Sequence, residues 1–473
     1  MIYWTLFNTE IYYLIAAAVF LGLSLTLRQS ARRDYLTALA LSAVGIGAAL
    51  AGFNQQGDLF AGAYRVDLFS QVFKILLAVG LFLIIFLCSE LNSVPENRHP
   101  EFYFLLITCT LAMMMLVSSV HLLTIYISLE LSSYSLYILV CLRKEDDKSL
   151  VSAIRYFLIG ATASALMLLG LALLYSAANT AYLIELIKTV PDIIHRPLII
   201  AGLFLTLSGF FFKLAIFPFH FWAPEAYYGA PNQVAAYIAT ASKVAAIAVL
   251  IRVVSLAGGE SRFLIHALVC LSIISMTVGN LCAIVQKDLK KLLAYSSIAH
   301  AGYVLIGILS FSRIGYGAAV FYALGLLILK FTCFFVVIKS VPDGSNPTID
   351  HLAGLHRRAP ILALALMVGL FGLAGIPPTV GFTAKFMVFA AAIEKGLFTL
   401  VVIAMLNVAV SLYYYLLLLK AAYLTEPREN LPELIVPVPV KLLAVAMITL
   451  IIVTGFFPTY LIQISRAASF MFG

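Results

Sequence analysis

Charged residues are scarce in this sequence, and their scarcity limits the class of protein. Asp, Glu, Lys and Arg make up 11% of the 473 residues and 63% are hydrophobic, whereas a soluble domain is about 25% charged. The apolar runs are long and continuous, which favours membrane-spanning helices over the short alternating strands of a β-barrel. The sequence therefore predicts an all-α polytopic membrane protein that forms a single membrane domain over residues 1–473.

Cysteine patterns and nucleotide-binding loops are missing from the sequence. The six cysteines are scattered, with no CxxC pair or Cys/His cluster, so we expect no zinc site, iron–sulfur site or disulfide framework. GxGxxG and Walker A patterns are also missing, so no nucleotide site is predicted. We therefore expect no cofactor and no metal in this chain. The net charge of +8 comes from basic residues in short loops, which favours a topology signal over nucleic-acid binding.

About fourteen apolar segments are long enough to cross a bilayer, at about 20 residues each. They cover residues 10–27, 36–52, 67–89, 102–119, 121–142, 150–176, 198–221, 231–254, 263–285, 290–310, 314–338, 360–393, 398–423 and 438–458. The seventh contains Pro218, and the twelfth contains Gly375, Pro377 and Pro378. Broken helices at membrane depth lie inside protein or beside a water-filled cavity. Two broken spans five positions apart indicate an internal repeat of about five spans.

Basic residues are concentrated in the loops that follow odd-numbered spans. The positive-inside rule then places these loops in the cytoplasm and both termini outside. The basic residues after odd-numbered spans are Arg28, Arg32, Arg33, Arg98, Arg143, Lys144, Lys148, Lys287, Lys290, Lys291, Lys339, Arg357, Arg358, Lys420 and Arg428. The loops after even-numbered spans carry only Arg65, Lys188, Arg196, Arg262, Arg313 and Lys395.

Four ionisable residues lie near the middle of predicted spans: Glu130, Lys213, Lys243 and Lys385. Placing a charge there costs about 2.5–3.5 kcal/mol on insertion scales, so such residues indicate an ion or proton path. Glu130 is the expected partner of Lys213, because burial and a nearby carboxylate together can make a lysine exchange its proton at neutral pH. The alternative for these residues is a structural ion pair that locks two helices together.

Hydroxyl groups are expected around these charges. A stripe on the face of Glu130 can hydrogen-bond a carboxylate or guide water. It consists of Tyr126, Ser133, Tyr134 and Tyr137. Thr240 lies one turn before Lys243, and Thr383 lies beside Lys385.

Lys330, His300 and Lys74 are further candidate proton relays. Lys330 is central in its span, with Thr332 and Cys333 as its expected polar neighbours. His300 is predicted to be a relay or, equally, a satisfied core histidine; the residues within its expected reach are Ser296, Ser297 and Tyr303. Lys74 shares a face with three polar residues, where a structural pair is favoured; they are Asp67, Ser70 and Gln71.

Several segments resemble the antiporter-like membrane subunits of respiratory complex I. They are GFFFKLAIFPFHFWAPEAYYGAP, ATASKVAA, KDLKKLLAYSSIAHAGY and GLAGIPPTVGFTAKFMVF. The resemblance runs from about residue 60 to residue 425 and is greatest to the NuoN-type subunits of proton-translocating NADH:quinone oxidoreductase. Lys385 favours this type, because NuoM-like subunits typically have glutamate there. The usual Pro-Asp pair of the family is Pro224-Glu225 here.

The resemblance implies fourteen helices with two inverted five-helix repeats, at 102–254 (helices 4–8) and 263–423 (helices 9–13). It implies one proton channel of a membrane arm, driven by quinone reduction elsewhere in the complex. Matched by motif, the proton-transfer residues are Glu130 (helix 5), Lys213 (its partner on helix 7), Lys243 (helix 8) and Lys385 (helix 12). Protons are then expected to load Lys243 from the cytoplasm and to leave through Lys385. Separation of Glu130 from Lys213 is expected to change the proton affinity of Lys243.

The same resemblance implies an enzyme complex, a translocase, with no redox site in this chain. NADH, FMN, iron–sulfur clusters and quinone are expected in partner subunits, and NuoM-like and NuoK-like subunits and lipids as neighbours, in a bacterial inner membrane. The first alternative is a stand-alone or Mrp-type cation/proton antiporter. The second is the equivalent subunit of a membrane-bound hydrogenase complex, which the presence of Lys330 leaves open. The third is a passive structural subunit whose buried charges only hold helices together.

Overall fold

A computed structural model describes residues 4–26, 30–144, 147–257, 261–426 and 434–469. Among these residues, thirteen helices are long and apolar enough to cross a membrane. The chain divides into two compact units, the N-terminal unit (residues 1–267 and 467–473) and the C-terminal unit (residues 268–466). The division falls close to the expected start of the second repeat at residue 263; the inverted repeats themselves stay a prediction. Arg28 and Arg428, two of the predicted topology signals, lie outside the described residues.

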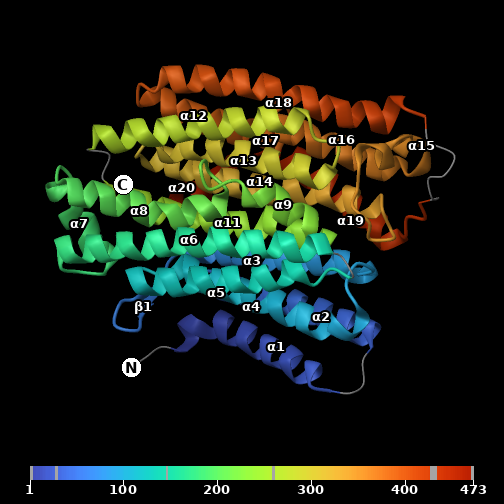
Figure 1. The fold of residues 1–473 in the computed structure, drawn as a ribbon, viewed down its shortest axis with the longest axis horizontal. Helices are drawn as coiled ribbons and strands as arrows, with labels where there is room; N and C mark the ends of the chain where they lie inside the picture. Colours follow the sequence, from blue (N-terminus) through green and yellow to red (C-terminus); the bar gives the residue numbers. More distant parts are fainter. Residues whose placement is uncertain (1–3, 27–29, 145–146, 258–260, 427–433, 470–473) are drawn as a thin grey trace. The chain divides into compact units, whose positions relative to one another are not determined.

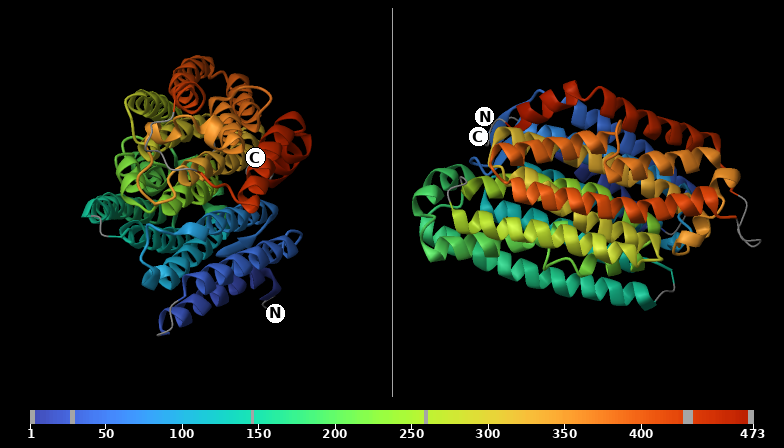
Figure 2. Two further views of the ribbon diagram at one scale, coloured as in Figure 1. Left: turned by 90° about the vertical axis from the view of Figure 1, so that its right-hand side faces the viewer. Right: turned by 90° about the horizontal axis from the view of Figure 1, so that it is seen from above.

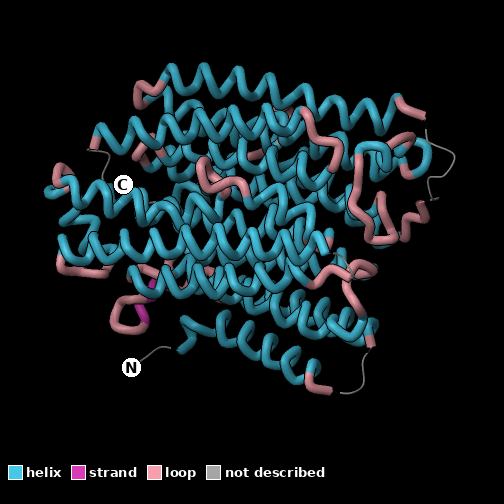
Figure 3. Tube along the Cα trace, in the orientation of Figure 1, coloured by secondary structure: helices cyan, strands magenta, loops and turns pink. Residues whose placement is uncertain are grey.

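The N-terminal unit is a bundle of helices that follow the predicted spans closely (Figure 1). Its helices are η1 (Trp4–Phe7), α1 (Asn8–Ser24), α2 (Ala31–Ala51), α3 (Leu68–Leu87), η2 (Cys88–Glu90), η3 (Glu96–Arg98), α4 (His99–Ser118), α5 (Leu122–Cys141), α6 (Asp147–Ala178), α7 (Leu183–Ile193), α8 (Pro197–Leu214), α9 (Trp222–Gly229), α10 (Asn232–Tyr237), η4 (Ile238–Ser242), α11 (Lys243–Val254) and η5 (Ser255–Ala257). The predicted eighth span is therefore α10, one π-helical turn (η4) and α11. The two strands, β1 (Gly57–Leu59) and β2 (Tyr64–Val66), form an antiparallel hairpin (Figure 3).

Connections between spans meet in two separate groups within the N-terminal unit. The connections after the second, fourth and sixth spans are joined by bridges between Tyr64 and Ser119 and between His121 and Tyr182. The connections after the third and fifth spans are joined by a hydrogen bond from the Lys144 amide to the Ser93 carbonyl, at 2.8 Å. Consecutive spans of this unit therefore cross in alternate directions, as a multi-pass membrane protein requires.

The predicted seventh span ends earlier than its hydropathy indicated. The sequence placed it at 198–221, but α8 ends at Leu214, and Ala215 has a positive φ of 59°. Pro218 explains this correction, because proline has no amide hydrogen to donate and disfavours a helical conformation in the residue before it. The chain resumes as the short helix α9 (Figure 3).

The C-terminal unit contains the remaining predicted spans. Its helices are α12 (Arg262–Ile284), which begins in the N-terminal unit, α13 (Leu289–Ile308), α14 (Arg313–Lys339), η6 (Ile349–Leu352), α15 (Leu355–Arg358), α16 (Pro360–Ala374), α17 (Val380–Glu394), α18 (Phe398–Leu424), α19 (Val438–Phe456) and α20 (Thr459–Ala468), which ends in the N-terminal unit. The connections after the ninth and eleventh spans meet, since the Leu289 amide donates to the Pro347 carbonyl at 2.9 Å.

The predicted twelfth span is two helices, α16 and α17, joined by residues 375–379. Gly375 follows the last residue of α16 with a φ of +85°, a left-handed conformation that glycine adopts without strain. Pro377 and Pro378 lie in the joining segment, where no helical amide is required of them.

Burial separates central helices from peripheral ones. The spans formed by α13 and α14 are 89% and 94% buried, whereas α12, α18 and α19 are 28–39% buried. The left view of Figure 2 looks obliquely along the helices, and α18 and α19, in red tones, lie at the margin of the C-terminal unit. Lys330 lies on α14, so one of the predicted relays is carried by the most enclosed helix of its unit.

Candidate functional site

The break after α8 brings a lysine and a tryptophan to two carbonyl groups. The last carbonyls of a helix have no amide partner within it and carry partial negative charge. Here Nε1 of Trp222 donates to the Phe212 carbonyl at 2.8 Å, and Nζ of Lys243 donates to the Lys213 carbonyl at 3.1 Å. The Lys243 ammonium also lies 5.1 Å from the centre of the Trp222 ring. Lys243 therefore lies at the C-terminal end of a broken helix.

The Lys213 side chain points to two hydroxyl groups of α5. Its Nζ donates to Oγ of Ser132 at 2.9 Å and to Oγ of Ser133 at 3.0 Å. The predicted ion pair with Glu130 is not formed among the described residues, because the two serines hold the ammonium instead. Lys213 is 1% exposed, so these serines are its polar surroundings in the interior of the protein.

Glu130 lies on α5 and accepts a hydrogen bond from the hydroxyl of Ser164 on α6. One member of the predicted stripe of hydroxyls around it, Ser133, contacts Lys213 instead. Glu130 and Lys213 are thus held by serines of different helices, Glu130 by Ser164 of α6 and Lys213 by two serines of α5. The sequence matched Glu130 with Lys213, whereas the structure gives the two side chains different partners.

The break between α16 and α17 holds Lys385 in the same manner. Its Nζ donates to the carbonyls of Leu373 and Ala374, the last residues of α16, at 2.8 and 2.9 Å. The ammonium lies 4.9 Å from the centre of the Tyr303 ring. The sequence suggested the hydroxyl of Thr383 as a polar neighbour of Lys385. In the structure this hydroxyl donates to the Gly455 carbonyl at 3.5 Å instead. Likewise, the Thr240 hydroxyl near Lys243 donates within its own helix.

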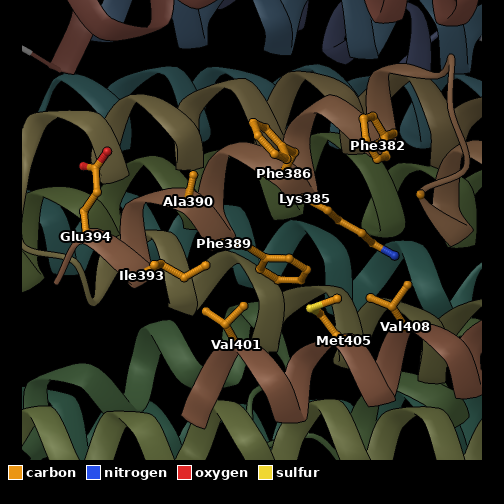
Figure 4. Close-up of a pocket in the computed structure, with 11 residues that line it drawn as sticks. Phe382, Lys385, Phe386, Phe389, Ala390, Ile393, Glu394, Val401, Met405 and Val408 are labelled. Atoms are coloured by element: carbon orange, nitrogen blue, oxygen red, sulfur yellow. The ribbon is translucent and has the colours of Figure 1, made fainter. Parts of the chain in front are cut away.

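A cavity of about 650 Å³ lies beside Lys385 in the C-terminal unit. Figure 4 shows that the lysine runs along this cavity between aromatic side chains of α17 and aliphatic side chains of α18, with Glu394 at its far end. The lining residues are Gly375, Phe382, Lys385, Phe386, Phe389, Ala390, Ile393, Glu394, Val401, Met405 and Val408.

Lys330 begins a chain of hydrogen bonds in the C-terminal unit. Its Nζ donates to Oγ of Ser296 at 2.7 Å and to the Leu293 carbonyl at 3.0 Å. Ser296 contacts the Tyr415 hydroxyl at 2.5 Å, and Tyr415 lies 3.4 Å from Nε2 of His300. Nδ1 of His300 in turn lies 2.8 Å from the hydroxyl of Tyr322. The Thr332 hydroxyl, an expected neighbour of Lys330, bonds to its own helix instead.

Lys74 belongs to a different kind of site. Its Nζ lies 2.8 Å from Oε1 of Glu10, and both side chains are 1% exposed. The Tyr64 hydroxyl donates to the same oxygen at 2.6 Å. Asp67, which the sequence grouped with Lys74, caps α3 and pairs with Arg252 at 3.0 Å. Lys74 therefore joins α3 to α1 through a buried ion pair.

Four of the buried lysines thus fall into two classes. Lys213, Lys330 and Lys385 are held by neutral hydroxyl and carbonyl oxygens, and among the described residues they form no ion pair. An ammonium held this way can release its proton without leaving a buried carboxylate unpaired. Lys74 is held differently, because it forms a buried ion pair in which Glu10 compensates its charge. The first class has the chemistry of a proton carrier and the second that of a helix clamp.

Sequence reasoning missed Ser132, Ser164, Trp222, Tyr415 and Glu10. Trp222 had a signal, because it is one of two tryptophans in the sequence and follows the Phe217-Pro218 break closely. Glu10, an acid in the first apolar stretch, had a similar signal. The serines and Tyr415 had none, since each lies on a different helix from its partner.

No group of three or more His, Cys, Asp or Glu side chains suited to hold a metal occurs in the described part of the chain.

The chain is similar to known membrane proteins over most of its length. Residues 119–411 match the family described as NADH:quinone oxidoreductase/Mrp antiporter, TM. The chain is 59% identical to a Syntrophobacter fumaroxidans protein named NADH-quinone oxidoreductase subunit N 2, over 98% of this chain and 99% of that protein. It is 34% identical to a chain of respiratory complex I from Thermus thermophilus with bound aureothin (TM-score 0.84; coverage 96% and 98%). A chain of the Mrp complex from Dietzia sp. DQ12-45-1b shares the fold at 19% identity (TM-score 0.86; coverage 98% and 96%).

Proposed function

Because this chain belongs to the NADH:quinone oxidoreductase/Mrp antiporter transmembrane family, we propose that it is the proton-translocating N-type membrane subunit of an NADH:quinone oxidoreductase. The 59% identity over nearly the full length supports this subunit type. The likeness to a chain of respiratory complex I supports a place in a membrane assembly. The single observation that carries the proton-transfer role is the set of buried lysines bound to neutral oxygens at helix breaks and hydroxyl groups.

In the proposed mechanism, Lys243 takes up a proton from the cytoplasmic side and Lys385 releases it to the outside. Glu130 and Lys213 alternate between the separated state seen here and a direct ion pair. Two unit charges at about 4 Å in an effective dielectric of 20 interact by about 4 kcal/mol. Moving one charge against 100 mV costs about 2.3 kcal/mol. The interaction energy that changes when this pair closes and opens is therefore large enough to drive proton release.

The proposal extends to partners and placement. NADH, FMN, iron–sulfur clusters and quinone belong to partner subunits, and quinone reduction there supplies the driving force. NuoM-like and NuoK-like subunits are the proposed neighbours, with lipid on the remaining faces. The basic connections after odd-numbered spans face the cytoplasm of a bacterium and both termini face outward.

Substitution of Lys243 by alanine tests the function. The variant complex is placed in inverted membrane vesicles, its assembly is checked on a native gel, and proton uptake is measured per quinone reduced. We expect an assembled complex with proton uptake lost. Lys188→Ala, which removes an exposed lysine of α7, is the matched control and should pump normally. Normal pumping by Lys243→Ala would contradict the proposed role.

The Mrp-type or stand-alone antiporter is separated from this proposal by its ion. Fold likeness at 19% identity does not distinguish the two. Sodium-dependent proton exchange in vesicles without an electron donor would establish the antiporter, whereas proton uptake that requires electron transfer establishes the respiratory subunit.

A further inference from the structure

We propose that Tyr415 is a proton-transfer residue that connects Lys330 to His300 through Ser296. This inference deepens the proposed proton-translocating function and depends on it. It assigns a role to the α18 helix, on which the sequence placed no functional residue.

The position of the Tyr415 hydroxyl supports this role. It lies 2.5 Å from Oγ of Ser296 and 3.4 Å from Nε2 of His300. Ser296 and His300 are one turn apart on α13, so a single side chain from α18 bridges both. A single one of these partners would be enough to satisfy the hydrogen bonding of the Tyr415 hydroxyl, so the second contact points to a bridging role.

Burial makes the chain of hydrogen bonds selective. Lys330, Ser296, Tyr415 and His300 are each 0–4% exposed. A buried ammonium, hydroxyl and imidazole can exchange protons only with groups they contact or with enclosed water. The described contacts join them in the order Lys330, Ser296, Tyr415, His300.

Each hydroxyl in the chain can accept one proton while donating another. Lys330 donates to Ser296, Ser296 donates to Tyr415, and Tyr415 donates to Nε2 of His300. In one concerted shift, the N–H bond of Lys330 breaks and its proton joins the Ser296 oxygen. The Ser296 proton moves to Tyr415 and the Tyr415 proton moves to His300. The products are a neutral amine and an imidazolium, one proton has crossed from Lys330 to His300, and rotation of the two hydroxyls resets the chain.

The neighbouring tyrosine provides a matched control. Tyr414 is also buried at 1% exposure, and its hydroxyl donates to Oδ1 of Asn280 at 3.0 Å. Tyr415→Phe and Tyr414→Phe each remove one buried hydroxyl from adjacent residues of the same helix and keep the ring. They differ in whether the hydroxyl lies between Ser296 and His300.

The test uses the assembled complex in inverted vesicles and measures proton uptake per quinone reduced, in H₂O and in D₂O. We expect Tyr415→Phe to lower uptake about tenfold or more, in line with the loss of a positioned proton-transfer group, and Tyr414→Phe to keep normal uptake. Ser296→Ala, which breaks the same chain at its other hydroxyl, should reproduce the loss. The slowed variants should show a larger D₂O effect than the native complex.

The outcomes separate this inference from the proposed function. Normal uptake by Tyr415→Phe and Ser296→Ala, together with loss in Lys243→Ala, overturns the relay and leaves the function standing. Normal uptake in all three overturns both. Equal losses in Tyr414→Phe and Tyr415→Phe also overturn the relay, because they show a packing effect. If Tyr415→Phe does not assemble, Ser296→Ala decides the question alone.

Discussion

The ammonium group of Lys385 donates to the carbonyl of Leu373 at 2.8 Å, at the C-terminal end of α16. Lys243 has the same relationship to the carbonyl of Lys213, at 3.1 Å, near the end of α8. A helix C-terminus carries a partial charge of about −0.5, which attracts a cation. The two helix breaks therefore supply binding places for a charged lysine within a membrane.

Gly375→Ala should weaken pumping by disturbing Lys385. The added Cβ would lie 2.8 Å from Cδ of Lys385, and the φ of +85° disfavours alanine by about 1–2 kcal/mol. Gly396→Ala is the matched control, because Gly396 has a φ of +76° but nothing within 4 Å of the added Cβ. We expect both variants to be less stable to heat and only Gly375→Ala to lose proton uptake. Equal uptake in the two would show that Lys385 tolerates displacement.

Trp222→Phe should destabilise the break after α8. The substitution removes the Nε1 donor and leaves the Phe212 carbonyl with the Ala215 amide alone, at 2.9 Å. Loss of one such hydrogen bond costs about 0.5–1.5 kcal/mol. The chain has one other tryptophan, Trp4, which is 55% exposed, so Trp4→Phe should change stability by about 0.5 kcal/mol or less. Thermal inactivation of the complex measures both. A midpoint for Trp222→Phe equal to that of Trp4→Phe would count against the hydrogen bond as a stabilising contact.

The double variant Ser132→Ala/Ser133→Ala should favour the closed pair of Lys213 and Glu130. Without the two hydroxyls, the Lys213 ammonium loses both acceptors seen here, and a direct ion pair is the remaining way to satisfy it. We expect an assembled complex that pumps slowly because the pair no longer opens. Ser135→Ala, on the same helix with its hydroxyl bonded to Leu131, is the control. Faster pumping by the double variant would refute this view of the serines.

Glu10→Gln and Lys74→Met should each cost stability rather than pumping. Removing one partner of a buried ion pair leaves the other uncompensated, at about 3–5 kcal/mol. Combining both substitutions should restore much of the loss, since no unpaired charge remains. Disruption of the exposed pair of Arg65 and Asp58 should cost about 0–1 kcal/mol. Native gels measure the yield of complex, and uptake per assembled complex should stay normal. Loss of that uptake would place Lys74 on the proton path.

The sequence by itself determined the approximate bounds of thirteen of the fourteen predicted spans, because long apolar runs can be recognised without knowledge of packing. The twelfth is the exception, since it consists of two shorter helices, α16 and α17. It also identified the breaks at Pro218 and Gly375, since proline and glycine act on their own local backbone. Its error at the end of α8 was local, where apolar character continued beyond the last helical residue.

Only the tertiary structure decided what holds each buried charge. Glu130 was matched with Lys213 on chemistry alone, yet serines of α5 and α6 hold them apart. Lys330 reaches Tyr415 through Ser296, so that side chains of α14, α13 and α18 meet. Side-chain periodicity predicts the face on which a residue lies, but the partner on that face depends on how helices pack, and packing brings together residues that have no pattern in common along the sequence.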